Sequence, residues 1–346
     1  MEITKSLIGT LKNREVVEYN LKNNNGIEVS ILNLGGIVTR IMTPDKNGNL
    51  ENIVLSYKNK EDYFTNPSYY GALIGRTSGR IAKGQAVLNE VELNFYLNYG
   101  ENSGHGGKEG FDKKFWTVKE ITSENECGLE LKYSSVNGEE GYPGNVDTTV
   151  TYTLNNDNEL ILLVKANSDE DTLFNVTNHS YFNLSGDYKR DVTSSELMMN
   201  CDEFLEVDET SAVTGVALDV TNTPFDFRTK KEIRRDINNV DRQLELGNGY
   251  DHPFVFNNEK GCITLEEAES GRGLKVETNQ PGVVIYTTNY PGEEDLTTGE
   301  KPKFRAAICL ETQAPPIASS GMFINQSILR KNEEYLKETK YKFYII

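Results

Sequence analysis

The sequence predicts an all-β protein, built as a large antiparallel β-sandwich with few short helices. Two observations support this class. Hydrophobic and polar residues alternate with a period of two in many segments, as expected for strands with one buried face. Asn, Asp and Gly turns separate these segments at short intervals up to the end of the chain, and helical periodicity is scarce. We therefore expect two or more packed sheets.

The individual elements follow from local patterns. Alternation is most regular at residues 27–31, 91–95 and 129–133. β-branched and aromatic residues predict four further strands, at 149–154, 160–164, 283–288 and 341–346. Residues 88–91 and 155–157 are expected to form hairpin turns. One short helix is expected within residues 229–246, where one face carries Ile233, Ile237, Val240 and Leu244.

Composition indicates a globular chain of one expected domain, residues 1–346. No Pro/Ser-rich linker, low-complexity tract or repeat divides it. The net charge of −17 argues against a nucleic-acid partner or an anionic membrane, because either would need a concentrated basic face. No apolar run reaches the length that crosses a bilayer.

The cysteines and the start of the chain predict the compartment. Four widely spaced cysteines form no CxxC pair, so neither a zinc site nor a redox motif is predicted. The first residues lack the basic start and apolar run of a signal peptide, so we expect a cytoplasmic protein with reduced thiols. Walker A, HExxH and GxSxG motifs are also missing, which disfavours nucleotide chemistry and serine hydrolysis.

A histidine in a polar setting is the most informative local feature. His179 lies within residues 177–184 among hydroxyls, an amide and two aromatic rings, and the chain has only three histidines. Histidine exchanges protons near neutral pH, so this setting suits an acid or base that contacts a sugar. A histidine in an ordinary loop is the alternative interpretation.

Other candidate residues are individually ambiguous. His105 lies in a run with four glycines between residues 100 and 107, which indicates either close backbone approach to a ligand or a tight turn. Glu311 follows the apolar run 306–310 and is expected at the end of a buried strand, as a tuned functional group or a structural ion-pair partner. Asp251 is either a turn residue or a site residue, and His252 is expected to be structural.

As an ordered set, these motifs resemble the aldose 1-epimerase, or galactose mutarotase, family. The resemblance extends from about Gly35 to the C-terminus, and the motifs follow the order of the family. They comprise an arginine loop at 70–84, a first histidine motif at 102–116, and residues 139–144, 177–184, 224–228, 250–252, 280–283 and 309–313.

The resemblance implies a β-sandwich of the galactose mutarotase type with no cofactor and no metal. The implied reaction interconverts the α and β anomers of a free aldohexose such as galactose or glucose. His179 would be the general acid at the ring oxygen and Glu311 the general base at the C1 hydroxyl, with the roles reversed on ring closure. The implied substrate-binding residues are Arg80, His105, Tyr181 and Asp251. The partner would be a small monosaccharide, and the oligomeric state, monomer or homodimer, stays open.

Four departures from the family pattern leave the preferred sugar open. Gly79 stands where many members have Asn, and Gly104 stands where Leu is common. Val284 occupies a wall position that can be polar or aromatic in relatives, and residues 314–320 stand where many members carry a run that contains Pro-Asp-Ala. None of these departures removes the implied acid or base.

Three alternative functions remain open at this point. A glycoside hydrolase would use Asp251 and Glu311 as its pair of carboxylates. A non-catalytic sugar-binding module could share the same scaffold, since a fold alone does not determine function. An epimerase of phosphorylated hexoses is disfavoured by the acidic charge balance.

Overall fold

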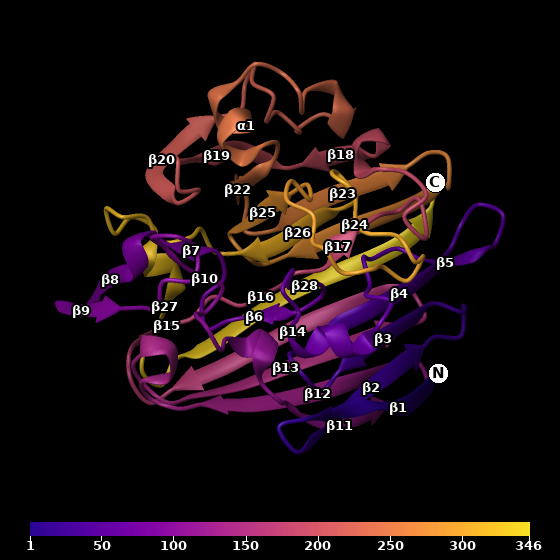
Figure 1. The fold of residues 1–346 in the computed structure, drawn as a ribbon, viewed down its shortest axis with the longest axis horizontal. Coiled ribbons are helices and arrows are strands. Elements are labelled where there is room, and N and C mark those ends of the chain that lie inside the picture. The colour runs from indigo at the N-terminus through magenta and orange to yellow at the C-terminus, as the bar shows by residue number, and fades with distance from the viewer.

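The computed structural model describes residues 1–346 and confirms the all-β class. Three large antiparallel sheets dominate the molecule, together with one α-helix and short 3₁₀ helices. Figure 1 shows these sheets layered against one another, with the C-terminal strand in yellow running through the middle of the molecule. No helix is long and apolar enough to cross a membrane.

The largest sheet has nine strands and contains four of the predicted segments. Residues 129–133, 149–154 and 160–164 lie within its strands, and 341–346 overlaps its C-terminal strand. The predicted turn after residue 154 joins two of its strands. In spatial order the strands are β11 (Thr117–Thr122), β12 (Glu126–Ser135), β13 (Val146–Asn155), β14 (Glu159–Ser168), β28 (Glu334–Ile345), β24 (Arg272–Thr278), β23 (Gly261–Glu267), β18 (Glu196–Met199) and β21 (Lys231–Glu232).

Two further sheets have five and six strands. The five-stranded sheet contains β1 (Glu2–Leu11), β2 (Arg14–Lys22), β3 (Glu28–Leu32), β4 (Val38–Pro44) and β5 (Leu50–Asn52). The six-stranded sheet, which carries most of the candidate site, has the order β17 (Tyr181–Phe182), β26 (Ile308–Gln313), β25 (Gly282–Tyr286), β22 (Asp251–Phe256), β19 (Cys201–Val207) and β20 (Val213–Asp219). The predicted strands 27–31 and 283–288 correspond to β3 and β25.

Short strand pairs and helices complete the fold. The pairs are β6 (Leu73–Ile74) with β16 (Thr177–Asn178), β7 (Arg80–Ile81) with β10 (Ser103–Gly104), β8 (Gln85–Leu88) with β9 (Val91–Asn94), and β15 (Thr172–Leu173) with β27 (Ile328–Leu329). The β8–β9 hairpin confirms the predicted turn, since Asn89 and Glu90 both have positive φ, as in a type I′ turn. The 3₁₀ helices cover residues 60–64, 82–84, 111–113, 139–141, 192–194, 233–235 and 324–327.

The one short helix expected within residues 229–246 is present, but only at the end of that segment. The α-helix, α1, covers only Arg242–Gly247, because the Asp241 side chain accepts hydrogen bonds from the backbone N–H groups of residues 243 and 244 and caps the helix there. Lys231–Glu232 instead pairs with β18 as an edge strand. Val240 is 98% exposed, so it does not belong to a buried helix face.

Buried side chains from the strands form a continuous core. One cluster of 51 buried residues includes the inward positions of β12, β13, β14 and β28. A second cluster of 15 residues, which contains Tyr70, Tyr181 and Cys309, lies beneath the candidate site. Each large apolar side chain buried in this way stabilises the fold by about 1.5–3 kcal/mol. The site therefore stands on a rigid, well-packed base.

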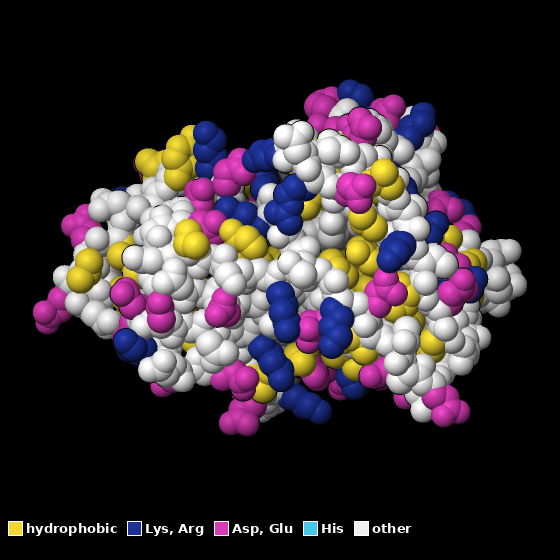
Figure 2. All heavy atoms as spheres, turned by 90° about the horizontal axis from the view of Figure 1, so that it is seen from below, with side chains coloured by type: hydrophobic (Ala, Val, Ile, Leu, Met, Phe, Trp, Pro, Cys, Tyr) yellow, Lys and Arg dark blue, Asp and Glu magenta, His cyan; other side chains and the backbone are white.

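Charged side chains at the surface are largely paired. In the view from below, Figure 2 shows basic side chains lying among acidic ones. Surface ion pairs include Arg242 with Glu209 at 2.8 Å and Lys301 with Glu293 at 2.7 Å. Acidic residues thus neutralise many of the basic ones locally.

Candidate active site

The floor of the candidate site is one face of the six-stranded sheet. Cross-strand partners share a face, and the strand register aligns two rows of side chains. The first row contains Tyr181, Cys309, Tyr286 and Asp251 on β17, β26, β25 and β22. The second row contains Glu311, Val284 and Pro253 on β26, β25 and β22. All of these residues except Cys309 line a cavity of about 240 Å³.

Glu311 lies inside a strand, and its expected position at a strand end is wrong. β26 continues to Gln313, which pairs with Gly282 on β25. The strand has a partner beyond Glu311, so its backbone hydrogen bonds continue past the carboxylate. All six residues of β26 are buried, and Glu311 is 3% exposed. A rigid backbone therefore holds this carboxylate.

Two segments outside the sheet place Arg80 and His105 over the floor. Gly104 of β10 pairs with Arg80 of β7, so His105 follows directly beside the arginine. The backbone N–H of His105 donates to the carbonyl oxygen of Gly79 at 3.0 Å. A Cβ on Gly106 would lie 1.8 Å from a neighbouring backbone oxygen. The glycine run therefore allows close packing of backbone on backbone, and this packing orients His105.

Backbone hydrogen bonds on both sides fix His179. It lies between β16 and β17, where its N–H donates to the carbonyl oxygen of Ala72 and its carbonyl oxygen accepts from Gly71 N–H. The Asn178 amide donates to the Gly71 carbonyl oxygen at 2.8 Å, and its oxygen accepts from the Ser180 hydroxyl at 2.6 Å. The polar residues around His179 thus anchor the loop and direct the imidazole into the cavity.

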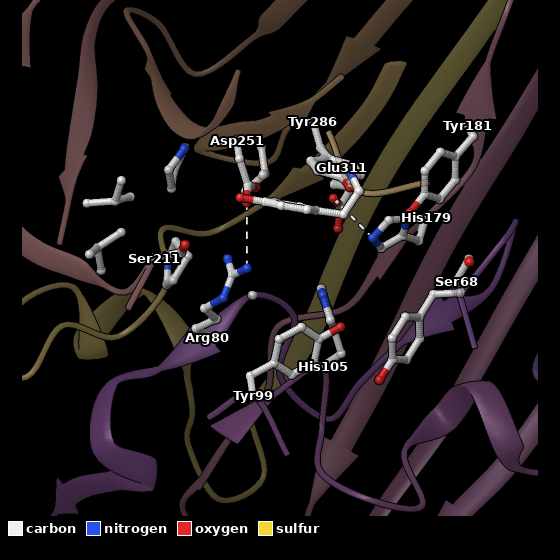
Figure 3. Close-up of a pocket in the computed structure, with 18 of the residues that line it drawn as sticks. Ser68, Arg80, Tyr99, His105, His179, Tyr181, Ser211, Asp251, Tyr286 and Glu311 are labelled. Carbon is white, nitrogen blue, oxygen red and sulfur yellow. Dashed lines mark hydrogen bonds and ion pairs between the residues drawn. The ribbon is translucent and has the colours of Figure 1, made fainter. Parts of the chain in front are cut away.

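His179 and Glu311 meet at the centre of the site (Figure 3). Nε2 of His179 lies 3.4 Å from Oε1 of Glu311, and both side chains are buried. Burial lowers the pKa of His179 to about 4. Burial, assisted by the charge of Asp251 and opposed by that of Arg80, raises the pKa of Glu311 to about 8. Near pH 7 the exchangeable proton of this pair therefore resides on Glu311, and the imidazole is neutral.

Arg80 and Asp251 form an ion pair beside the acid–base pair. Arg80 Nη2 lies 3.5 Å from Asp251 Oδ2, as the second dashed line in Figure 3 marks. The two side chains are 24% and 12% exposed, so both face the cavity without being sealed from it. A guanidinium donates and a carboxylate accepts, which suits them to bind sugar hydroxyls. Arg80 is the only Lys or Arg among the residues that line the cavity.

Aromatic rings that the sequence did not single out form much of the wall. Tyr69 and Tyr99 lie 5.0 and 5.4 Å from His105, measured between ring centroids. Tyr181, which was predicted, stacks on His179 at 5.0 Å and 25°. Tyr286 follows Val284 by two residues and shares its face of a predicted strand, so alternation along that strand is the signal that could have identified it. No local pattern marks Tyr69 and Tyr99, because both enter the site from loops.

His252 is buried away from the cavity, as its structural assignment predicts. It is fully buried and lies 4.8 Å from the Phe225 ring. Its Nδ1 accepts a hydrogen bond of 3.1 Å from the Asp251 backbone N–H. Burial lowers its pKa to about 3, so it stays neutral. His252 therefore helps to hold Asp251 in place and lies outside the cavity lining.

Comparison with known proteins identifies the family. The family described as Aldose 1-epimerase matches residues 17–342, almost the whole chain. The chain belongs to the aldose 1-epimerase family. This confirms the resemblance seen in the sequence and the expectation of an isomerase.

Individual aldose 1-epimerases and mutarotases match over similar lengths. A galactose mutarotase from Sus scrofa is 35% identical over 349 residues, covering 99% of each chain. An aldose 1-epimerase from Haemophilus influenzae is 35% identical over 328 residues, covering 93% of this chain and 94% of its own. The crystal structure of a galactose 1-epimerase from Lactobacillus acidophilus superposes with a TM-score of 0.89 at 31% identity, covering 99% of each chain.

Of the four positions that depart from the aldose 1-epimerase pattern, Gly79, Val284 and the run 314–320 contribute to the cavity lining, and Gly104 lies behind Tyr99. A Cβ on Gly79 would come 2.7 Å from Pro316, which belongs to the divergent run 314–320 and also lines the cavity. A Cβ on Gly104 would come 2.4 Å from the Tyr99 ring, so the glycine makes room for that ring. Val284 forms part of the floor. Pro316 and Tyr99 therefore occupy the space that a side chain at Gly79 or Gly104 would need.

His179, Cys309 and Glu311 also cluster closely enough to be considered as metal ligands. Cys309 faces Nδ1 of the imidazole, whereas Glu311 faces Nε2. A metal ion takes one nitrogen of an imidazole along its lone pair, so an ion shared with the thiolate would lie on the far side of the ring from Glu311. Burial also raises the pKa of the Cys309 thiol well above its usual range, which opposes the thiolate that a metal needs. The donor set does not fit a metal.

Proposed function

We propose that the protein interconverts the α and β anomers of free aldohexoses such as galactose and glucose, with His179 and Glu311 as acid and base. The contact of 3.4 Å between Nε2 and Oε1 in a buried cavity is the observation that carries this assignment. Ring opening needs one proton delivered to the ring oxygen and one removed from the C1 hydroxyl. Two adjacent groups that share a proton provide both functions, and each contributes a factor of about 10²–10⁴.

The number of protons is conserved through the cycle. The resting pair, a Glu311 carboxylic acid with a neutral imidazole, contains as many protons as the reactive pair, a carboxylate with an imidazolium. A sugar hydroxyl that donates to Asp251 shields that charge from Glu311 and lowers the Glu311 pKa. Substrate binding therefore favours the reactive pair.

The reaction then proceeds in two symmetrical halves. The Glu311 carboxylate takes the proton of the C1 hydroxyl while Nε2 of His179 gives its proton to the ring oxygen, and the bond between C1 and that oxygen breaks. The aldehyde turns about the C1–C2 bond. On closure His179 takes the proton from the C5 hydroxyl, that oxygen attacks the other face of C1, and Glu311 returns a proton to the former carbonyl oxygen.

The remaining residues bind the sugar in this proposal. Arg80 and Asp251 hold hydroxyl groups through charged hydrogen bonds, which keep the open-chain intermediate in the cavity. His105, whose ring lies 5.3 Å from that of His179, donates near the ring oxygen. Tyr181 covers one face of the His179 imidazole.

The geometry disfavours the alternative functions. A hydrolase that uses Asp251 and Glu311 as its carboxylate pair would leave His179 without a function, although Nε2 of His179 lies 3.4 Å from Glu311 at the centre of the site. A phosphorylated hexose would need unpaired basic side chains, and Arg80, the only basic residue in the lining, already has a carboxylate partner. We place the enzyme in the cytoplasm, where its four free cysteines stay reduced.

Polarimetry tests the proposal directly. The rotation of freshly dissolved α-D-galactose and α-D-glucose is followed with the wild type, Glu311→Gln and His179→Asn. We expect the wild type to accelerate equilibration and both variants to lose at least about 100-fold in kcat. A wild type that adds nothing to the spontaneous rate with any free aldose contradicts the activity. Two fully active variants contradict only the residue assignment.

A further inference from the structure

Cys309 is a buried residue that the proposed proton transfers do not use. It lies on β26 two residues before Glu311, is 0% exposed and does not line the cavity. Its Sγ lies 3.6 Å from Nδ1 of His179. The two nitrogens of the imidazole therefore have different neighbours, a thiol at Nδ1 and a carboxyl group at Nε2.

The mechanism requires the two nitrogens to behave differently. Nε2 gives its proton to the ring oxygen and later takes one back, so it must be without a proton when the sugar is open. A neutral imidazole keeps one proton, which must then stay on Nδ1. A shift of that proton to Nε2 would leave no lone pair to accept the proton of the C5 hydroxyl. The Nδ1 proton therefore needs an acceptor.

The thiol beside Nδ1 can supply this acceptor. Burial keeps the Cys309 thiol neutral, so its sulfur is a weak acceptor. A proton on Nδ1 would meet this acceptor, so the contact favours the tautomer with Nδ1–H.

We propose that Cys309 is a positioning residue that accepts a hydrogen bond from Nδ1–H of His179 and thereby restricts proton exchange to Nε2. A carboxylate in its place would bind the imidazolium strongly and weaken it as an acid. A neutral thiol fixes the tautomer without this effect. The consequence for catalysis rests on the proposed function, whereas the tautomer itself does not.

Nitrogen NMR can read the tautomer without turnover. In protein labelled with ¹⁵N-histidine only three imidazoles give signals, those of residues 105, 179 and 252. His179→Asn removes one set and so assigns it. At neutral pH we expect His179 to carry its proton on Nδ1, with Nε2 in the unprotonated form. A His179 protonated on Nε2 in the wild type overturns the proposal.

Two substitutions at Cys309 separate hydrogen bonding from packing. Cys309→Ser retains an acceptor, and we expect it to keep the wild-type tautomer and nearly all of kcat. Cys309→Val fills the space without an acceptor, and we expect a mixture of His179 tautomers with kcat reduced about 10-fold and KM little changed. Loss of a charged partner costs a catalytic histidine up to about 10⁴-fold, and a thiol bond is weaker.

The controls make each outcome decisive. The signals of His105 and His252 should be the same in all variants, and far-ultraviolet circular dichroism confirms folding. Cys309→Ala replaces the valine variant if the latter does not fold. An acceptor-free variant that keeps both the wild-type tautomer and full kcat overturns the proposal. A wild type without mutarotase activity overturns the proposed function, while the nitrogen signals still decide the role of Cys309.

Discussion

His179 Nε2 and Glu311 Oε1 lie 3.4 Å apart, although 131 residues separate them in the chain. β17 and β26 are neighbours in the six-stranded sheet, and this pairing brings the two side chains together. Burial disfavours charge on both groups, which raises the pKa of the carboxyl group and lowers that of the imidazole. One proton shared between them is therefore the stable state over a broad pH range.

The first prediction is a bell-shaped pH profile of kcat/KM. The pair is active with one shared proton. Activity falls at high pH as Glu311, with a pKa of about 8, loses that proton, and at low pH as His179, with a pKa of about 4, gains a second one. Polarimetry between pH 3.5 and 9.5, corrected for the spontaneous rate, measures both limbs. A flat profile through pH 9.5 contradicts the shared-proton state.

The second prediction concerns the charges beside the pair. Asp251 raises the pKa of Glu311 and Arg80 lowers it. Asp251→Asn should therefore move the alkaline limb of kcat/KM to lower pH, and Arg80→Gln should move it to higher pH. Both variants should also raise KM, since each removes a hydroxyl-binding charge. Shifts in the same direction for both variants refute an electrostatic origin.

The third prediction links Glu311 to stability. The pKa of Glu311 is raised from 4.5 in the unfolded chain to about 8 in the folded protein. Between these pH values the folded protein keeps a proton that the unfolded chain has released. The stability of the folded protein therefore decreases as the pH rises from about 4.5 to about 8. Glu311→Gln stays neutral. At pH 8.5 the free energy of unfolding of this variant should exceed that of the wild type by on the order of a few kcal/mol, and its melting temperature should be correspondingly higher. Near pH 4 the two melting temperatures should match. Differential scanning calorimetry at both pH values checks this, and a difference independent of pH argues against it.

The fourth prediction concerns sugar selectivity. Val284 is the cross-strand neighbour of Glu311 on β25, on the side of β26 away from His179. If the ring oxygen lies at His179 and the C1 hydroxyl at Glu311, as proposed, we expect C2 on the side of Val284. Val284→Thr keeps the shape and adds a hydroxyl, so it should favour D-galactose over 2-deoxy-D-galactose in kcat/KM by about 2–10-fold relative to the wild type.

A matched substitution controls this selectivity test. Val213 lines the same cavity from β20, three strands away from β25. Val213→Thr adds the same hydroxyl at a distance from C2 and should leave the ratio of the two sugars unchanged. An equal change in both variants would show that the effect is not local to Glu311 and its neighbour.

The sequence alone determined the class of fold and the identity of the family. Period-two alternation at residues 129–133 and 149–154 predicted strands that the structure contains, because one face of each strand is buried. The ordered motifs also named the candidate acid, base and hydroxyl-binding residues. The sequence did not locate the short helix expected within residues 229–246, because strand pairing at β21 and the cap at Asp241 confine it to Arg242–Gly247.

Only the tertiary structure decided how the site works. Register between β17, β26, β25 and β22 places Tyr286 beside Asp251 and Val284 beside Glu311, and no local pattern could show these neighbours, because register depends on strands that are distant in sequence. The proton positions on His179 and Glu311 depend on burial and on the charges of Asp251 and Arg80. The sequence names these residues, but their chemistry arises from the distances that the packed sheets impose.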